Sequence, residues 1–158
     1  MKILVLGGDG YLGWPTAMHF SAAGCDVAVV DNFMKREMEA ECGVQPLWPI
    51  PLLQKRVALW KEVTGKEIKV FIGDIAKDES FLHKVLDSFR PNAIIHYAEQ
   101  PSAPYSMANQ RQAVSTQVNN VVGTLNLLWA MKDVCPNAHL VKLGTMGEYG
   151  TPNIRIEE

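Results

Sequence analysis

The sequence has little cysteine and no excess of charge of either sign. Its 158 residues contain three cysteines, at positions 25, 42 and 135, an odd number without any C-x-x-C spacing. Neither a disulfide framework nor a zinc or other metal site is indicated, and we expect buried, reduced thiols. The formal net charge of −2 argues against a nucleic-acid partner or a membrane surface, since both usually require a basic face.

Long hydrophobic runs are also missing. The first residues, MKILVLGG, are too short an apolar stretch for the core of a signal peptide, and no later run approaches the length of a membrane span. The composition, 47% hydrophobic and 20% charged, is that of a globular chain about one domain in size. We therefore expect a soluble, cytoplasmic protein.

Short apolar runs alternate with helical patterns along the chain. The predicted strands are Ile3 to Leu6, Val27 to Val30, Val70 to Ile72, Ala93 to Tyr97 and His139 to Leu143. The predicted helices cover residues 12–23, 78–90 and 113–134. This alternation is typical of a parallel sheet with helices on both faces. The predicted fold class is α/β, a doubly wound parallel sheet, with residues 1–158 in one domain.

A glycine-rich turn follows the first predicted strand. Gly7, Gly10 and Gly13 form a G-x-x-G-x-x-G pattern where strand passes into helix. In such a turn the first glycine permits the tight bend, the second lets a pyrophosphate approach the backbone, and the third allows close packing of helix on sheet. The N–H groups at the start of the helix, around Tyr11 and Leu12, then face the anion.

A carboxylate stands where a dinucleotide needs one. Asp31 ends the second strand 18 residues after Gly13, and there it can accept hydrogen bonds from both ribose hydroxyls. Glycine patterns occur in many unrelated sequences, but the combination with Asp31 is specific. Because Asp31 would repel a 2′-phosphate, the sequence favours NAD over NADP, with Lys35 and Arg36 nearby as a counterweight.

Further candidate polar residues lie at the ends of the third, fourth and fifth predicted strands and within the last predicted helix. Asp74 follows the third strand and can accept from the adenine amino group, although a carboxylate in a turn is the simpler explanation for it alone. His96 is expected only to line the wall of the ligand site, without a catalytic role. Asn119 and Asn120 lie in a predicted helix, where asparagine is unfavourable, so they either make retained hydrogen bonds or face solvent. Thr145 directly follows the fifth strand, where a hydroxyl can face the nicotinamide.

One connection is longer than this scheme needs. Residues 33–67 contain three prolines and then an amphipathic stretch in which Leu53, Val57 and Trp60 recur at helical spacing. We interpret this segment as a loop followed by a helix. It is either a surface decoration or an elaboration near the cofactor end of the sheet.

The motifs GGDGYLG, VVDN, GDI, IIHYAEQ, NNVVGTLNLL and GTMGEYG, in this order, resemble the extended short-chain dehydrogenase/reductase superfamily. More narrowly, GGDGYLGW, AEQPSAPYSM and VKLGTMGEYGTPNI resemble the UDP-sulfoquinovose synthase family. This resemblance implies a Rossmann-like NAD-binding domain. It implies NAD contacts from Gly7, Gly10, Tyr11, Leu12, Gly13, Asp31, Asn32, Arg36, Asp74, Ile75, Tyr97, Ala98, Glu99 and Asn120.

The same resemblance implies UDP-glucose and sulfite as substrates. In that family NAD oxidises C4 of the sugar, water leaves across C5 and C6, sulfite adds at C6, and the hydride returns. Gln100 and Ser102 would contact substrate, and Thr145 would bond the 4-hydroxyl. Glu148 would act as acid/base at C5 and C6, or else cap or pair within a loop. Pro101 stands where plant members carry arginine.

The superfamily's proton-transferring pair is a tyrosine with a lysine four residues later. The residues four positions after the four tyrosines are Pro15, Pro101, Asn109 and Asn153. In the family this pair follows the Thr145 motif. We therefore expect the chain to be the N-terminal part of a longer enzyme that is homodimeric when complete, and to be inactive alone. Its fifth strand would then have an open edge that favours self-association.

Two alternatives remain open from the sequence. One is a different nucleotide-sugar epimerase or 4,6-dehydratase. The other is a non-enzymatic NAD-binding module, because the glycine turn and Asp31 are complete without any further sequence.

Overall fold

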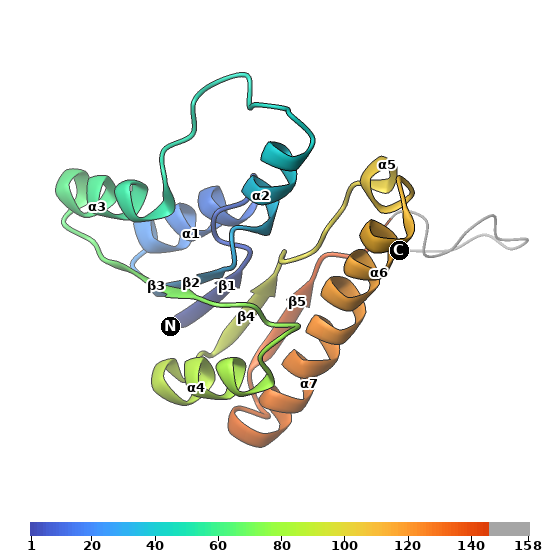
Figure 1. Ribbon diagram of the computed structural model, residues 1–158. Helices are drawn as coiled ribbons and strands as arrows, with labels where there is room; N and C mark the ends of the chain where they lie inside the picture. Colours follow the sequence, from blue (N-terminus) through green and yellow to red (C-terminus); the bar gives the residue numbers. More distant parts are fainter. Residues whose placement is uncertain (146–158) are drawn as a thin grey trace, which may run out of the picture.

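The computed structural model describes residues 1–145 and is built around one parallel sheet (Figure 1). Its strand order is β3-β2-β1-β4-β5. The strands are β1 (Lys2–Leu6), β2 (Asp26–Asp31), β3 (Ile68–Ile72), β4 (Ala93–His96) and β5 (His139–Lys142). All neighbours are parallel, so the predicted fold class is confirmed, with strand ends shifted by one or two residues.

Helices cover both faces of this sheet. They are α1 (Gly13–Ala22), α2 (Met34–Glu41), α3 (Leu53–Thr64), α4 (Glu79–Phe89), α5 (Ala103–Ser106), α6 (Gln110–Gln117), the π-helix η1 (Val118–Val122) and α7 (Gly123–Val134). On one face α1 and α3 pack on the sheet, and on the other α4 and α7 pack side by side (Figure 1). Asp78 caps α4 by accepting a hydrogen bond from the Ser80 N–H at 3.0 Å.

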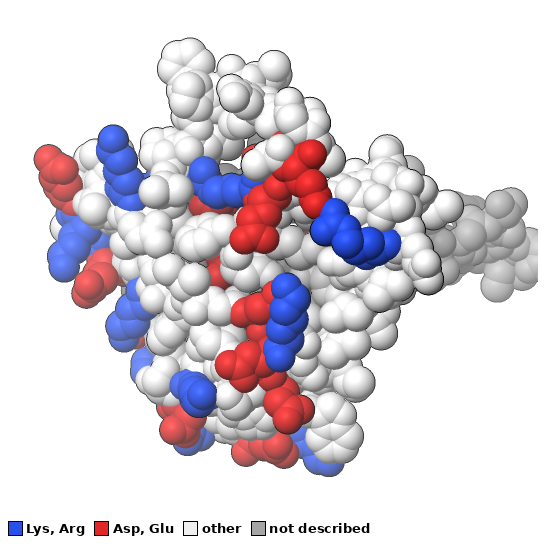
Figure 2. Space-filling view, in the orientation of Figure 1, with Lys and Arg blue, Asp and Glu red and all other residues white. Residues whose placement is uncertain are grey.

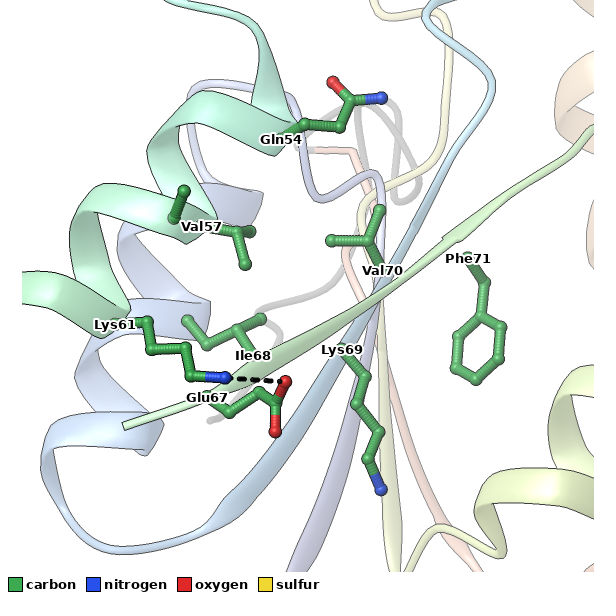
Figure 3. A pocket seen from close by; sticks show the side chains of 9 residues that line it. Gln54, Val57, Lys61, Glu67, Ile68, Lys69, Val70 and Phe71 are labelled. Carbon is green, nitrogen blue, oxygen red and sulfur yellow. Dashed lines mark hydrogen bonds and ion pairs between the residues drawn. The ribbon is translucent and has the colours of Figure 1, made fainter. Parts of the chain in front are cut away.

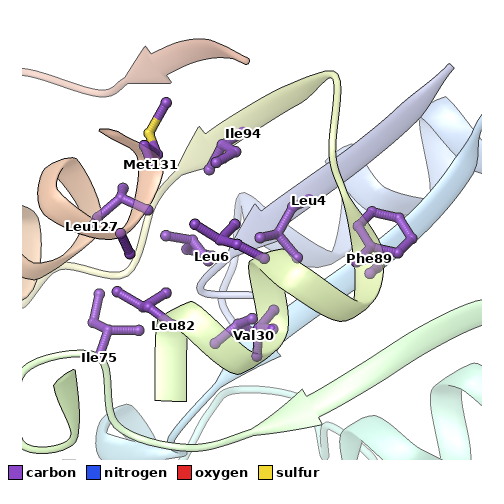
Figure 4. Packing of buried hydrophobic residues seen from close by; sticks show 13 residues of the cluster. Leu4, Leu6, Val30, Ile75, Leu82, Phe89, Ile94, Leu127 and Met131 are labelled. Atoms are coloured by element: carbon purple, nitrogen blue, oxygen red, sulfur yellow. The ribbon is translucent and has the colours of Figure 1, made fainter. Parts of the chain in front are cut away.

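The central strands are apolar because both of their faces are buried. Successive side chains of β1 alternate between two cores, so that Leu4 and Leu6 join one and Ile3 and Val5 the other. Figure 4 shows the first core, in which α4 and α7 pack against the strands. A continuous run of buried residues, rather than an alternating pattern, is what a sheet covered on both faces requires.

The connection between β2 and β3 differs from the prediction at its start. A loop was expected from residue 33, but α2 begins at Met34, directly after β2. Because no residue of α2 is fully buried, its sequence carries no apolar stripe to reveal it. Its residues, MKREMEAE, are nevertheless strong helix formers. The loop is confined to residues 42–52, and α3 follows as expected.

The long helix predicted over residues 113–134 has three parts. It begins as α6, where Asn109 caps the N-terminus by accepting from the Gln112 N–H at 3.0 Å. It then widens into η1 and continues as α7. The short helix α5 lies between β4 and α6, where the sequence pattern predicted neither a strand nor a helix. Single π turns inside α-helices are frequent at functional sites, and this one contains both asparagines of interest.

Two compositional expectations can be compared with the described residues. Within residues 1–145 no helix has the length and apolarity needed to cross a membrane, and no cluster of three or more His, Cys, Asp or Glu residues suits a metal ion. The three cysteines are free thiols. The expectation that they are buried is wrong for Cys42, which is exposed at the C-terminal end of α2, and Cys25 and Cys135 are only partly buried.

Candidate cofactor-binding site

The carboxyl ends of all five strands meet at one edge of the sheet. Leu6 of β1 is paired with Val30 of β2 and with His96 of β4, and His96 is paired with Lys142 of β5. The residues that follow these positions therefore lie in one row. In open parallel sheets ligands bind outside this edge.

The glycine turn is sterically demanding at two positions. Gly7 has a φ of +86°, and a Cβ there would lie 2.9 Å from the backbone of Tyr97 and Ala98. A Cβ on Gly13 would lie 1.9 Å from the Gly7 carbonyl oxygen. Gly10 closes the turn by donating its N–H to that same carbonyl at 3.1 Å. The three glycines thus let β1, the start of α1 and the loop after β4 come together.

The start of α1 presents unpaired backbone donors. Within residues 1–145, the N–H groups of Tyr11, Leu12 and Gly13 have no hydrogen-bond acceptor, and Leu12 provides no side-chain cap. The Tyr11 side chain is exposed beside them. These donors, together with the positive end of the helix dipole, suit an anionic group such as a diphosphate.

Asp31 lies at the end of β2 with its carboxylate facing the glycine turn. Its Oδ2 accepts from the Asp9 N–H at 2.8 Å, and its Oδ1 accepts from the Phe33 N–H at 2.7 Å. Burial raises the pKa of Asp31 above its ordinary value even though these bonds oppose the rise, and the charge of Asp9 adds to it. A carboxylate has about four acceptor positions, so two remain for ribose hydroxyls.

Asp74 and Asn32 connect the ends of β3 and β2. The Asn32 amide donates to Asp74 Oδ2 at 3.2 Å, and Asp74 Oδ1 accepts from the Ala76 N–H at 2.9 Å. Burial tends to raise the pKa of Asp74, but these hydrogen bonds and those from Lys77 outweigh it and lower the pKa. The Ile75 side chain is buried in the core, so only its backbone can reach a cofactor.

The loop after β4 is held by a buried histidine. His96 Nδ1 accepts from the Ala98 N–H at 3.2 Å, which makes Nε2 the donor to Thr124 Oγ1 at 3.2 Å. Burial lowers the pKa of His96 to about 4, so the ring is neutral near pH 7. This arrangement is consistent with the predicted role of His96 in lining the wall of the site. Glu99 in the same loop forms an ion pair with Lys142 of β5.

The two asparagines of η1 bind the same loop rather than facing solvent. Asn120 donates to the Gln100 carbonyl at 3.0 Å and accepts from the Gln100 N–H at 2.9 Å. Asn119 donates to the Ala98 carbonyl at 3.4 Å and to the Asn120 side chain at 2.9 Å. The structure therefore gives Asn120 a supporting position, since it holds the backbone of Gln100 in this loop.

The residues predicted to contact substrate lie along the following segment. The Gln100 side chain is buried and donates to Thr116 Oγ1 at 2.9 Å and to the Ser102 carbonyl at 3.1 Å. Ser102 caps α5 by accepting from the Tyr105 N–H at 3.3 Å. Thr145 lies exposed just beyond β5, and Glu148 lies outside the described residues. The substrate roles of these four residues stay predictions.

Sequence reasoning assigned no role to Asp9 or Arg56, two charged residues beside the glycine turn. Arg36, which was predicted to contact the cofactor, donates from Nε to Asp9 Oδ2 at 2.6 Å and from Nη2 to Oδ1 at 3.0 Å. Arg56 of α3 forms an ion pair with the same carboxylate. A hollow of about 580 Å³ adjoins them and is also lined by Gly10 and Tyr11. The available signal was Asp9 itself, because a carboxylate in an anion-binding turn needs a cationic partner.

A second hollow, of about 480 Å³, lies between α3 and β3 (Figure 3). Its lining includes Val57, Ile68 and the Lys61–Glu67 ion pair at 3.4 Å, but none of the predicted site residues. On the face shown in Figure 2, acidic and basic side chains are interspersed, without the broad basic patch of a nucleic-acid-binding surface.

Comparison with known proteins identifies the family. Residues 3–158 match the model of the NAD dependent epimerase/dehydratase family. The chain is 50% identical over 157 residues to the chloroplastic UDP-sulfoquinovose synthase of Spinacia oleracea, covering 99% of this chain and 32% of that protein. It is 44% identical over 158 residues to the UDP-sulfoquinovose synthase of Sulfolobus acidocaldarius, covering 100% of this chain and 40% of that protein.

A solved structure supports the same grouping. The UDP-glucose 4-epimerase of Bifidobacterium longum, in complex with NAD⁺ and UDP, superimposes with a TM-score of 0.73 at 26% identity over 98% of this chain and 40% of that chain. The chain thus spans between about a third and two fifths of the length of these relatives. It belongs to the NAD dependent epimerase/dehydratase family, whose cofactor is the NAD that the sequence predicts.

Proposed function

We propose that this chain is the NAD-binding part of a UDP-sulfoquinovose synthase, which converts UDP-glucose and sulfite to UDP-sulfoquinovose through a 4-keto intermediate. The observation that carries the proposal is its identity of 50% and 44%, over essentially the whole chain, to two proteins of that name from a plant and an archaeon. The matched length includes the loop after β4 and the Thr145 segment, where substrate contacts are expected.

The site geometry supports NAD binding by the described residues. The diphosphate would lie at the free N–H groups of Tyr11, Leu12 and Gly13, and the adenine ribose at Asp31. Asn32, Asp74 and the Ile75 backbone would hold the adenine, and the hydrogen bond from Asn32 to Asp74 supports this by joining the ends of β2 and β3. The remaining contacts proposed for the cofactor come from Gly7, Gly10, Arg36, Tyr97, Ala98 and Glu99, with Asn120 behind them.

NAD, when bound, would supply the acceptor and later the donor of a hydride at C4 of the sugar. The chain's own part would be to exclude water along the loop after β4 and to orient the sugar. Thr145 would hydrogen-bond the 4-hydroxyl, and Glu148 would exchange protons in the C5 and C6 steps. Gln100 and Ser102 would shape the wall of the sugar site.

The test has two parts. Calorimetry with NAD⁺ and the 158-residue chain should show binding at a single site. Turnover of UDP-glucose with sulfite should require a chain that also contains a Tyr-x-x-x-Lys pair, because general-base catalysis by such a group is worth roughly 10²–10⁴-fold. Sulfite-dependent product from the 158 residues alone would contradict the proposed inactivity, and absence of NAD⁺ binding would contradict the proposal itself.

Two other functions are separated by the same experiments. A UDP-glucose 4-epimerase, suggested by the likeness to the Bifidobacterium longum structure, would convert UDP-glucose without sulfite. A non-enzymatic NAD-binding module, suggested by a glycine turn and Asp31 that are complete within the described residues, would bind NAD⁺ tightly and remain inactive even in its longest natural form.

We also propose a homodimer, formed through the outer side of α6, η1 and α7. Seven exposed apolar side chains follow one another at helical spacing along these three elements: Val114, Val118, Val121, Val122, Leu125, Leu128 and Trp129. They are between 36% and 59% exposed. A stripe of this kind on a helix is normally covered, and a second copy would cover it symmetrically. A cytoplasmic location stays a prediction.

A further inference from the structure

Asp9 is an acidic side chain within the glycine turn, beside free N–H groups that suit an anion. Its carboxylate is only 7% exposed and is approached by two guanidinium groups from the connection between β2 and β3. Arg36 of α2 contacts both carboxylate oxygens, and Arg56 of α3 contacts Oδ1 and the Asp9 carbonyl, the latter at 3.1 Å. Two cations thus share one anion beside the free N–H groups of α1.

The two arginines are held very differently. The Arg56 side chain is 12% exposed, and its guanidinium lies over the Trp14 ring at 5.0 Å. Its helix, α3, is anchored in the core by Leu53. Arg56 is therefore a fixed partner of Asp9.

Arg36 is the more exposed of the pair. Its side chain is 28% exposed, and it belongs to α2, which has no fully buried residue. Its other hydrogen bonds go to the Ile50 and Pro51 carbonyls, at 3.3 and 2.9 Å, in an exposed loop. Arg36 also lines the hollow that reaches Gly10 and Tyr11.

The number of positive charges around Asp9 determines whether Arg36 can leave it. One guanidinium is sufficient to neutralise a buried carboxylate, and a buried carboxylate left without one is strongly disfavoured. If Arg36 were the only partner, its movement toward a ligand would leave Asp9 unpaired. Because Arg56 remains, Arg36 can leave Asp9 and pair with an anion at the start of α1.

We propose that Arg56 is a positioning residue for dinucleotide binding: it retains the Asp9 carboxylate so that Arg36 can pair with the diphosphate. The inference rests on the proposed binding of NAD and deepens it. It also gives the long connection between β2 and β3 a role at the site, through α3. A purely structural Arg56 would stabilise the fold equally with and without the charge of Asp9 and would not influence diphosphate binding.

The experiment uses the 158-residue chain, with NAD⁺ and adenosine as probes in calorimetry. Arg56→Met should weaken NAD⁺ binding by about tenfold or more and leave adenosine binding unchanged, because Arg36 is then retained by Asp9. In an Asp9→Asn background the same Arg56→Met change should alter NAD⁺ affinity by less than about threefold. Lys61→Met, a loss of one exposed positive charge on the same helix, should change neither affinity.

Equal NAD⁺ affinity of Arg56→Met and the unchanged chain would overturn the inference. So would a loss that persists in the Asp9→Asn background, or one that appears equally with adenosine. If Arg56→Met does not fold, Arg56→Lys takes its place, and the inference requires NAD⁺ affinity within about threefold of the unchanged chain. An unchanged chain that binds no NAD⁺ at all would instead refute the proposed function.

Discussion

At the scale of single residues, burial decides how the ionisable groups of the site behave. Asp31 and His96 both lie at the carboxyl edge of the sheet, and desolvation disfavours the charged form of each. The result is opposite in sign, since it raises the pKa of the acid and lowers that of the base. Each shift leads to a measurable pH dependence.

Replacing Asp31 with alanine should weaken NAD⁺ binding by about 1.5–3 kcal/mol, because the ribose hydroxyls lose a charged acceptor. Asp26→Ala, at the opposite end of the same strand, is the control and should have no effect. Since the ionised carboxylate is the acceptor and its pKa is raised, the affinity of the unchanged chain should fall with decreasing pH earlier than an ordinary aspartate would cause. Calorimetry that finds equal affinity for Asp31→Ala would remove Asp31 from the site.

His96 should make the fold acid-sensitive. Its pKa is about 4 in the folded chain and has an ordinary value of 6.5 in the unfolded chain, so the unfolded chain binds the proton first. The contribution of the neutral ring is fully present above pH 6.5 and is lost as the pH falls from 6.5 to 4. It amounts to about 3 kcal/mol of unfolding free energy.

Urea unfolding between pH 7 and pH 4 measures this contribution. His96→Gln should show a correspondingly smaller loss of stability on acidification, whereas His83→Gln, at an exposed position, should keep the full loss. Identical pH profiles for the unchanged chain and His96→Gln would contradict the assignment.

At the scale of elements, η1 determines how the loop after β4 is presented. The wider π turn places Asn119 and Asn120 side by side, and both point at backbone groups of that loop. The loop therefore depends on a helix that is 20 residues further along the chain. This dependence explains why asparagine is retained where helix propensity disfavours it.

Asn120→Ala should lower the free energy of unfolding by about 1–3 kcal/mol, because the N–H and carbonyl of buried Gln100 lose their partners. Gln117→Ala, on the exposed side of the preceding turn, is the matched control and should be close to neutral. Urea unfolding reports the energy, and hydrogen exchange at the Gln100 amide reports the local opening. Unchanged exchange at that amide would show that the asparagine does not support the loop.

At the scale of the whole molecule, two surfaces of the described residues expose apolar side chains or an unpaired strand edge. One is the apolar stripe along α6, η1 and α7. The other is the outer edge of β5, which has no strand partner within the described residues and exposes Val141 and Leu143. Open edges recruit further chains, so the expected self-association through β5 stays a prediction.

The proposed dimer interface is tested by placing a charge at the centre of the apolar stripe. Leu125→Lys should shift the protein from dimer to monomer in sedimentation equilibrium, since a buried unpaired lysine strongly disfavours the interface. Leu59→Lys, at an equally exposed leucine of α3, should leave the association unchanged. A dimer that persists in Leu125→Lys at the same concentration would place the interface elsewhere.

The sequence by itself determined the order of strands and helices, the glycine turn and the place of Asp31 at the end of β2. These features depend on residues close together in the chain: apolar runs, turn chemistry and helical spacing. It did not reveal α2, because that helix has no buried face, nor the π turn, because five residues are too few to show a change of helical period.

Only the tertiary structure decided which charges meet. Asp9 and Arg56 are 47 residues apart, and their contact depends on α3 packing beside α1 under the glycine turn. Asn120 likewise reaches Gln100 only because α7 packs on the sheet next to β4. No local pattern encodes such pairs, since they arise from the paths that buried strands and helices impose on the chain between them.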